Sequence, residues 1–232
     1  MSADLVKKNP DVDPFLLKKW ERVFNVFFDV NANEVVEWGD FYVVLRHVRD
    51  IYGAESAQLG YAKKQMGILW DALVKLADKN NDKQITLDEW VTVLKKSDPK
   101  TQPVWFKDYC NFMFKLFDVS ADDVLDLAEY TDGMIAYGVN QKDAHSAFRK
   151  FATDIVGNPL STVSYGQFEK LFNEYFYSTA PNDKGNCLFG IIDVVGNPLS
   201  VVEYSIFAKL WQEYFYSTNP SDKGNHLFGI LV

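Results

Sequence analysis

Three twelve-residue segments carry oxygen-bearing side chains at the same alternating positions. They begin at Asp29, Asp78 and Asp118, and each has such a side chain at positions 1, 3, 5 and 9 and a carboxylate at position 12. A hard cation such as Ca²⁺ takes about six to eight oxygen ligands, and alternating positions of a tightly turned loop point toward one centre. Position 7 contributes its backbone carbonyl, whatever its side chain. The spacing therefore predicts three cation sites.

The alternation assigns five ligands to each loop. They are Asp29, Asn31, Asn33, Val35 and Asp40 in the first loop, Asp78, Asn80, Asp82, Gln84 and Glu89 in the second, and Asp118, Ser120, Asp122, Val124 and Glu129 in the third. The third loop carries the most carboxylates and gives the strongest signal. The first loop closes with Asp40 in place of Glu. We expect this shorter side chain to bind through one oxygen, which makes Mg²⁺ a more serious competitor of Ca²⁺ there.

All three loops lack the glycine that usually stands at position 6 of such a loop. Glu34, Lys83 and Asp123 take its place. The sharp turn needs a positive φ, which costs a residue other than glycine about 1 kcal/mol or more, although Asp adopts it more readily than Glu or Lys. We therefore expect the first and second sites to bind about tenfold more weakly than their ligands suggest, without losing the metal.

Hydrophobic residues spaced at threes and fours flank each loop, which predicts amphipathic helices on both sides. The first helix is expected to begin at Asp13 and Pro14, a capping residue and a first-turn proline. An aromatic residue, Phe41, Trp90 or Tyr130, follows position 12 in every loop. A single acidic turn could equally be a solvated surface loop. Three turns in register between amphipathic helices favour the helix–loop–helix calcium hand, the EF-hand.

A fourth hand follows, with a loop that has lost its ligands. Its entering helix is expected from Asp143 to Phe151. Alignment of Val163 with position 8 and Phe168 with position 13 leaves the side-chain ligand positions to Val156, Asn158, Leu160, Ser164 and Gln167. A start at Asp154 is no better, because neither alignment closes the loop with a carboxylate. This hand is predicted to be structural and to complete a pair with the third.

The loop and exiting helix of the fourth hand are present twice. Residues 154–161 return as 193–200, and the match continues to the end of the chain at a constant offset of 39. The second copy closes its loop with Ile206 and lacks an entering helix, so it is predicted to bind no Ca²⁺. Two explanations stay open. Either the chain retains both versions of an alternative exon and the working protein is the shorter one, or a genuine extra helix docks elsewhere or exchanges with the first.

The hands together resemble the invertebrate sarcoplasmic calcium-binding proteins, and most closely their calexcitin branch. The resemblance covers about residues 13–190. It is carried by Asp-Val-Asn at 29–31, Phe-Asp-Val-Ser at 117–120, Leu-Ala-Glu-Tyr-Thr-Asp-Gly-Met at 127–134, the Asn-Pro-Leu-Ser of the fourth hand and the Asn-x-Leu-Phe-Gly tail. It implies three calcium sites and a cytosolic role in buffering or neuronal signalling.

The resemblance also implies an all-α fold. Two pairs of hands would pack into one globule, with hands 1 and 2 in residues 13–98 and hands 3 and 4 in 103–190. Residues 191–232 would be the extra half-hand. The calexcitin branch is associated with nucleotide binding and channel modulation as well. No Gly-x-x-x-x-Gly-Lys-Ser/Thr loop is present in this sequence, so nucleotide binding is not carried over.

Composition narrows the class of function. The chain has 24 basic and 32 acidic residues and a formal charge of −8, which argues against nucleic acid and against a polybasic membrane surface. No apolar run is long enough to cross a bilayer, and the polar N-terminus does not read as a signal peptide. His47, His145 and His226 have no zinc spacing with Cys110 or Cys187, and no catalytic motif is recognisable. A cytoplasmic, monomeric, non-enzymatic protein is expected.

The choice between a buffer and a sensor rests on the apolar residues. Sensors open on binding Ca²⁺ and expose a methionine-rich groove. This chain has 4 Met against 18 Phe, 12 Tyr and 6 Trp, which favours a permanently packed aromatic interior and thus a buffer. A sensor acting on a protein target, and an interaction protein that has lost metal binding, remain the alternatives.

Overall fold

The computed structural model describes residues 3–190, 211 and 214–216. Residues 1–192 and 193–232 form separate compact units. The predicted extra half-hand at 191–232 therefore lies outside the described residues, apart from residues 211 and 214–216. The boundaries predicted between the two pairs of hands stay a prediction, because both pairs belong to the first unit.

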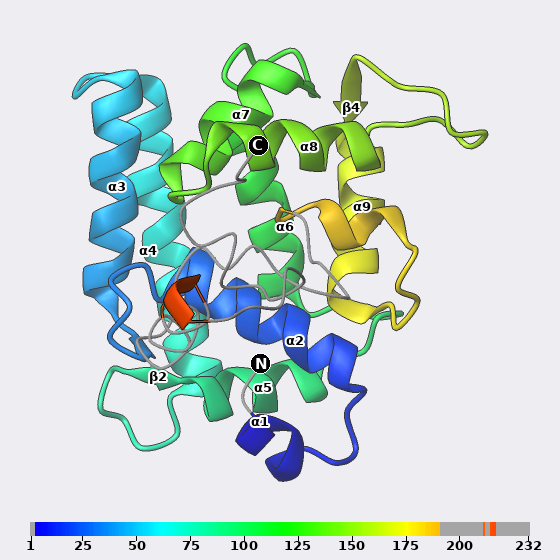
Figure 1. Ribbon diagram of the computed structural model, residues 1–232. Coiled ribbons are helices and arrows are strands. Elements are labelled where there is room, and N and C mark those ends of the chain that lie inside the picture. Colours follow the sequence, from blue (N-terminus) through cyan, green and yellow to red (C-terminus); the bar gives the residue numbers. More distant parts are fainter. Residues whose placement is uncertain (1–2, 191–210, 212–213, 217–232) are drawn as a thin grey trace. The chain divides into compact units, whose positions relative to one another are not determined.

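The described chain is predominantly helical, and its strands are two or three residues long (Figure 1). The all-α prediction is confirmed. The helices are α1 (Ala3–Lys8), α2 (Pro14–Val23), the π-helix η1 (Phe24–Phe28), α3 (Trp38–Tyr52), α4 (Ala57–Ala77), α5 (Leu87–Lys95), α6 (Val104–Phe117), α7 (Leu127–Ala136), α8 (Gln141–Phe151), α9 (Tyr165–Tyr177) and the 3-10 helix η2 (Lys184–Cys187). The strands are β1 (Val35–Val36), β2 (Ile85–Thr86), β3 (Val124–Asp126) and β4 (Thr162–Ser164).

Each strand comes from a loop, and the loops pair through them. Strand β1 pairs antiparallel with β2, and β3 pairs antiparallel with β4. Val36 lies opposite Ile85 in the first pair, and Leu125 lies opposite Val163 in the second. Position 8 therefore faces position 8 in both sheets. The second sheet places Val163 as the alignment of the degenerate fourth loop predicts.

Side-chain caps fix where the helices begin. The Asp13 carboxylate accepts a hydrogen bond from the Phe15 backbone N–H, with Pro14 in the first turn of α2, as the sequence predicts. At the exiting helices, the residue at position 9 and the residue at position 12 cap each other's backbone N–H groups. This reciprocal cap fixes the position-12 side chain at the first turn of the exiting helix.

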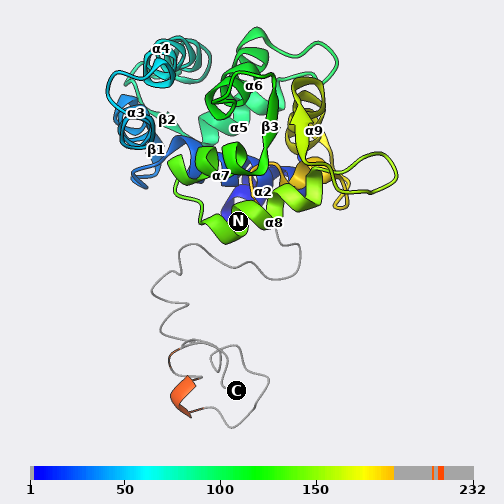
Figure 2. The ribbon, with the colours of Figure 1, turned by 90° about the horizontal axis from the view of Figure 1, so that it is seen from above.

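Aromatic rings join the first two hands to the last two. Helix α6 packs between α4 and α9 (Figures 1 and 2). The ring centroids of Phe28 and Tyr109 are 5.1 Å apart, and those of Trp90 and Trp105 are 6.1 Å apart. Such buried aromatic pairs stabilise beyond the area they bury. The four loops are thus held on one hydrophobic core.

The chain after α9 returns to the core and closes it. Phe189 is buried, with its ring centroid 4.8 Å from those of Phe27 and Tyr175. The Lys19 ammonium, which is also buried, donates to the Ser178 carbonyl at 2.6 Å and to the Asn186 side-chain oxygen at 3.0 Å. Burial lowers the pKa of Lys19 to about 8. These contacts tie the first helices of the chain to the segment that follows α9.

Candidate metal centre

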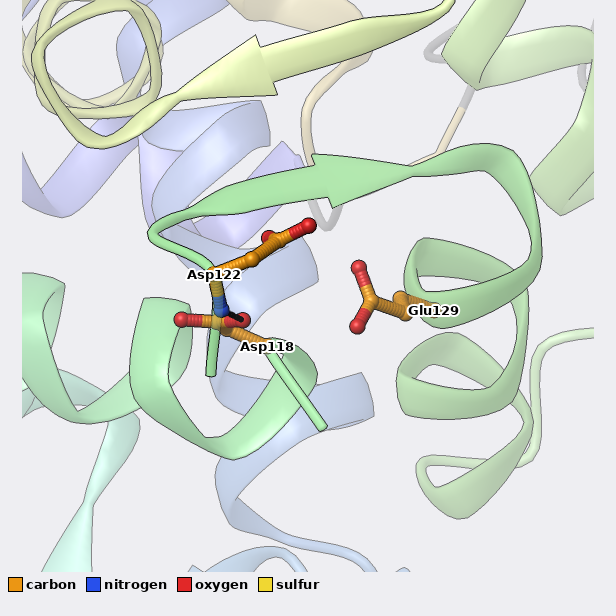
Figure 3. A group of neighbouring side chains, drawn as sticks. All are labelled: Asp118, Asp122 and Glu129. Atoms are coloured by element: carbon orange, nitrogen blue, oxygen red, sulfur yellow. Dashed lines mark hydrogen bonds between the residues drawn. The ribbon is translucent and has the colours of Figure 1, made fainter. Parts of the chain in front are cut away.

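Three carboxylates of the third loop converge on one point. Asp118 stands at the end of α6, Asp122 lies in the turn, and Glu129 lies in the first turn of α7. One oxygen from each lies within 4.8 Å of the others, and Figure 3 shows Glu129 reaching across toward the two Asp side chains. In the part of the chain that the structure describes, this is the one group of three acidic side chains close enough to share an ion.

The environment of Asp118 fits a cation. Its side chain is buried, and Oδ1 accepts the Asp122 backbone N–H at 3.2 Å. Oδ2 is buried as well but accepts no hydrogen bond, and the nearest positive charge is the Lys115 ammonium at 3.7 Å. A buried carboxylate oxygen without a hydrogen bond is costly, and a bound cation would compensate it directly. Ligands that are all oxygen favour Ca²⁺ or Mg²⁺ over softer metals.

The residue at position 12 bridges the start and the end of each of the first three loops. Glu129 accepts the Ser120 N–H at 2.9 Å through one oxygen and the Asp126 N–H at 3.2 Å through the other. The same bridge is made by Asp40 to Asn31 and Glu37, and by Glu89 to Lys79 and Thr86. In each closing carboxylate, one oxygen thus accepts an N–H group from the start of the loop and the other accepts one from position 9.

Position 1 of the first two loops is buried and bonded through both oxygens. Asp29 accepts the N–H groups of Asn33 and Glu34 at 3.0 and 2.9 Å. Asp78 accepts those of Asp82 and Lys83 at 3.3 and 2.9 Å. These bonds fold each loop around its first carboxylate.

The remaining predicted ligands lie in the same turns. Side chains at the exposed tips of the loops are those of Asn31, Asn33, Asn80, Asp82, Ser120 and Asp122, whereas Val35, Gln84 and Val124 lie where each loop meets its strand. The side-chain oxygen of Asn31 accepts the Asn33 N–H at 3.0 Å, and that of Asn80 accepts the Asp82 N–H at 3.1 Å. The full ligand sets of all three loops stay predictions.

Asp40 closes the first loop from a buried position. Burial raises the pKa of its carboxyl group, although the N–H groups of Glu37 and Asn31 act in the opposite direction. A metal ligand must be deprotonated to bind. If the first loop binds a metal as predicted, protons would compete with it at a higher pH than at an ordinary Asp.

The backbone takes the strained turn that the sequence predicts. Position 6 has a positive φ in each loop, with 72° at Glu34, 60° at Lys83 and 62° at Asp123. Position 4 is also left-handed in each loop, which the sequence reasoning did not anticipate; these residues are Ala32, Asn81 and Ala121. Asn tolerates this region better than Ala does, so only Asn81 among these three residues is of a type that indicates a left-handed backbone.

Replacing Lys83 by Gly is expected to raise the free energy of unfolding by about 1 kcal/mol, because glycine adopts a φ of 60° without a steric penalty. Urea denaturation measures the change. Asp123→Gly is the matched control, and a smaller gain is expected there. Asp adopts this region more readily, and the substitution also removes the 2.5 Å contact with Lys115. A loss of stability in Lys83→Gly would contradict the strain argument.

The helix that enters the first loop ends in a π-turn. In η1 the Asp29 N–H bonds to the Phe24 carbonyl at 2.7 Å, five residues back. Such turns are rare and often lie at functional sites. The apolar spacing of this stretch does not distinguish it from an α-helix, so the π-turn could not be predicted from the sequence.

The fourth loop lacks the acidic centre. Asn158 bonds to the Asp154 carboxylate through its backbone and its side chain, at 2.9 and 2.8 Å. At position 12, the Gln167 side-chain oxygen accepts the N–H of Ser164 at 2.9 Å, which is one half of the bridge that the position-12 carboxylates make in the first three loops. The fourth loop therefore keeps the cap and the strand pairing, and it has a neutral amide where a carboxylate would close a site.

Comparisons with known proteins extend these observations. No model of a protein family matches the chain. It is similar to Calexcitin-1 of Caenorhabditis elegans, with 57% identity over 189 residues that cover 82% of this chain and 93% of the relative. It is also similar to the sarcoplasmic calcium-binding proteins I, III, and IV of Branchiostoma lanceolatum, with 23% identity over 186 residues that cover 77% of this chain and 98% of the relative.

Solved structures share the fold. The sarcoplasmic calcium-binding protein from amphioxus aligns with a TM-score of 0.64 at 21% identity, covering 78% of this chain and 100% of that one. The photoprotein clytin aligns with a TM-score of 0.55 at 18% identity, covering 76% and 93%. Among the described helices, none combines the length and the apolarity that crossing a membrane would require.

Proposed function

Because the chain belongs to the family of calexcitin and the sarcoplasmic calcium-binding proteins, we propose that it is a calcium-binding protein, with one site in each of its first three loops. The observation that carries the proposal is the buried Oδ2 of Asp118, which accepts no hydrogen bond and belongs to a convergent group of three carboxylates. The protein is proposed to bind the ion reversibly in the cytoplasm, as a monomer without enzymatic activity.

The first and the last residue of each loop have different roles in binding the ion. Position 1 begins each site from a buried carboxylate, and position 12 closes it from the first turn of the exiting helix, where the helix dipole favours negative charge. Bound Ca²⁺ would supply the positive charge that offsets the repulsion among the carboxylates. The third loop, with the most carboxylates and with Asp at position 6, is proposed to bind most tightly.

Isothermal titration calorimetry with Ca²⁺ tests the proposal. About three sites are expected, with the first also taking Mg²⁺, because Asp40 is a shorter closing ligand than Glu. Absence of binding heat at millimolar Ca²⁺, together with an unchanged protein spectrum, would overturn the metal-binding function and leave an interaction protein.

Buffering is the role that the packing supports better than sensing. Met66, Met113 and Met134 are all buried, and rings from the two pairs of hands interlock across the core. Opening a methionine-rich groove would require separation of these aromatic contacts. A protein target therefore belongs to the sensor alternative.

Addition of Ca²⁺ is expected to cause no rise in the fluorescence of a dye that reports exposed apolar surface. The physical reason is that the aromatic core already buries the surfaces a sensor would expose. A known sensor hand protein measured in parallel gives the size of a positive response. A comparable rise in dye fluorescence with this protein would favour the sensor.

A further inference from the structure

The second copy of the fourth hand repeats the buried positions of the first. Between residues 154 and 190, every buried residue returns unchanged 39 positions later, with the single exception of Phe172, which returns as Trp211. The other substitutions fall on exposed or half-buried positions, such as Gln167, which returns as Ile206. A segment that only needed to be a soluble tail would have no reason to retain a core-facing pattern.

The contacts that hold the first copy are repeated too. The buried Lys19 ammonium donates to the Glu174 carbonyl at 3.2 Å, the Ser178 carbonyl at 2.6 Å and the Asn186 side chain at 3.0 Å. All three residues return at the offset of 39, as Glu213, Ser217 and Asn225. The second copy therefore contains the acceptors for this one buried cation.

The residues of a close backbone contact in the first copy also return in the second copy. A Cβ at Gly185 would lie 2.4 Å from the Leu171 carbonyl oxygen, so only glycine fits where η2 meets α9. This residue returns as Gly224, and Leu171 returns as Leu210. Any larger residue at Gly185 would block the packing of the first copy. The second copy keeps glycine at the matching position, as expected of a segment that can pack in the same way.

The described residues of the second copy expose the face that the first copy buries. Trp211 and Phe215 are helical residues with 42% and 53% of their surface exposed, and their ring centroids are 4.9 Å apart. Their counterparts Phe172 and Phe176 are 0% exposed in α9. The second copy would therefore gain apolar burial in the groove where α9 lies.

We propose that residues 193–232 are a reserve occupant of the groove that holds α9 and η2, and that they replace residues 154–190 there within the same chain. Exchange between two chains would bury no more apolar surface than exchange within one chain. Two chains have two such grooves and four copies of the segment, so two copies would still lack a groove, and the chains would also have to associate. Direct replacement leaves the first copy as a long surface loop, which costs chain entropy. Ile206 in place of Gln167 also removes half of the reciprocal cap at the start of the exiting helix. The first copy is thus the favoured occupant, and the second takes over when the first is weakened.

Hydrogen–deuterium exchange on full-length variants tests the exchange, because mass spectrometry distinguishes peptides of 165–177 from those of 204–216. Leu171→Ala with Phe176→Ala is expected to reduce protection at 165–177 and to increase it at 204–216 relative to the wild type. Phe176→Ala alone should give the same transfer in part. The matched control, Leu210→Ala with Phe215→Ala, should leave protection at 165–177 unchanged. All four substitutions together should melt about 10 °C or more below the Leu171/Phe176 variant, because neither copy can then fill the groove.

Loss of protection at 165–177 with no gain at 204–216 would overturn the proposal. Equal melting temperatures for the Leu171/Phe176 variant and the fourfold variant would overturn it as well, since the second copy would then contribute nothing. Sedimentation distinguishes exchange within one chain from exchange between two chains. A gain at 204–216 in a monomer supports exchange within the chain, and a gain that appears only in a dimer overturns it.

Discussion

Replacing Glu129 by Gln is expected to remove calcium binding at the third loop and to lower the calorimetric stoichiometry by one site. Gln keeps the length of the side chain and can still accept the Ser120 and Asp126 N–H groups, so the loop should keep its shape. It loses the negative charge and the second hard oxygen that a bidentate ligand needs. We expect affinity at this loop to fall about a hundredfold or more, which corresponds to about 3 kcal/mol.

Asp132→Asn is the matched control for charge. Asp132 is exposed in the second turn of the same helix, three residues after Glu129, and it belongs to none of the proposed sites. This variant should bind the same number of ions as the wild type, with at most a small change in affinity from the long-range field. An unchanged stoichiometry in Glu129→Gln would mean that the third site is centred on other residues.

Local rules were sufficient to predict the loops. The position of each turn followed from the alternation of oxygen-bearing side chains, and the positive φ at Glu34, Lys83 and Asp123 followed from the steric demand of position 6. The pairing of Val163 with Leu125 followed from aligning one aliphatic residue. These features are set within about twelve residues of chain, so a sequence pattern can report them.

Contacts between distant segments were beyond the same reasoning. Lys19 reads as an ordinary surface lysine, yet it is buried because acceptors more than 150 residues away surround its ammonium group. Phe189 reads as part of a tail, yet it fills the core beside Phe27. The π-turn before the first loop was also missed, since its apolar spacing is that of an α-helix. Tertiary packing decides each of these cases, and no local pattern encodes it.

Calcium removal is expected to have the largest effect on stability. A ligand that binds only the folded state stabilises it by RT ln(1 + [L]/Kd). For a Kd of about 1 µM and about 1 mM free Ca²⁺, that is about 4 kcal/mol for each site and about 12 kcal/mol for three. Chelation should therefore lower the melting temperature by about 25 °C or more. Differential scanning calorimetry with Ca²⁺ or with excess chelator measures the shift.

The structure gives a reason for this dependence beyond mass action. Asp29, Asp40, Asp78 and Asp118 are all buried, and burying a carboxylate is costly unless a charge or enough hydrogen bonds compensate it. Without Ca²⁺ the folded state bears that cost. Glu129→Gln should then show at most about two-thirds of the wild-type shift, because the third loop, which is proposed to bind most tightly, supplies at least one third of it, whereas Asp132→Asn should show all of it. A melting temperature that does not respond to chelator would mean that the loops are held by their internal hydrogen bonds alone, and calcium binding would then contribute nothing to folding.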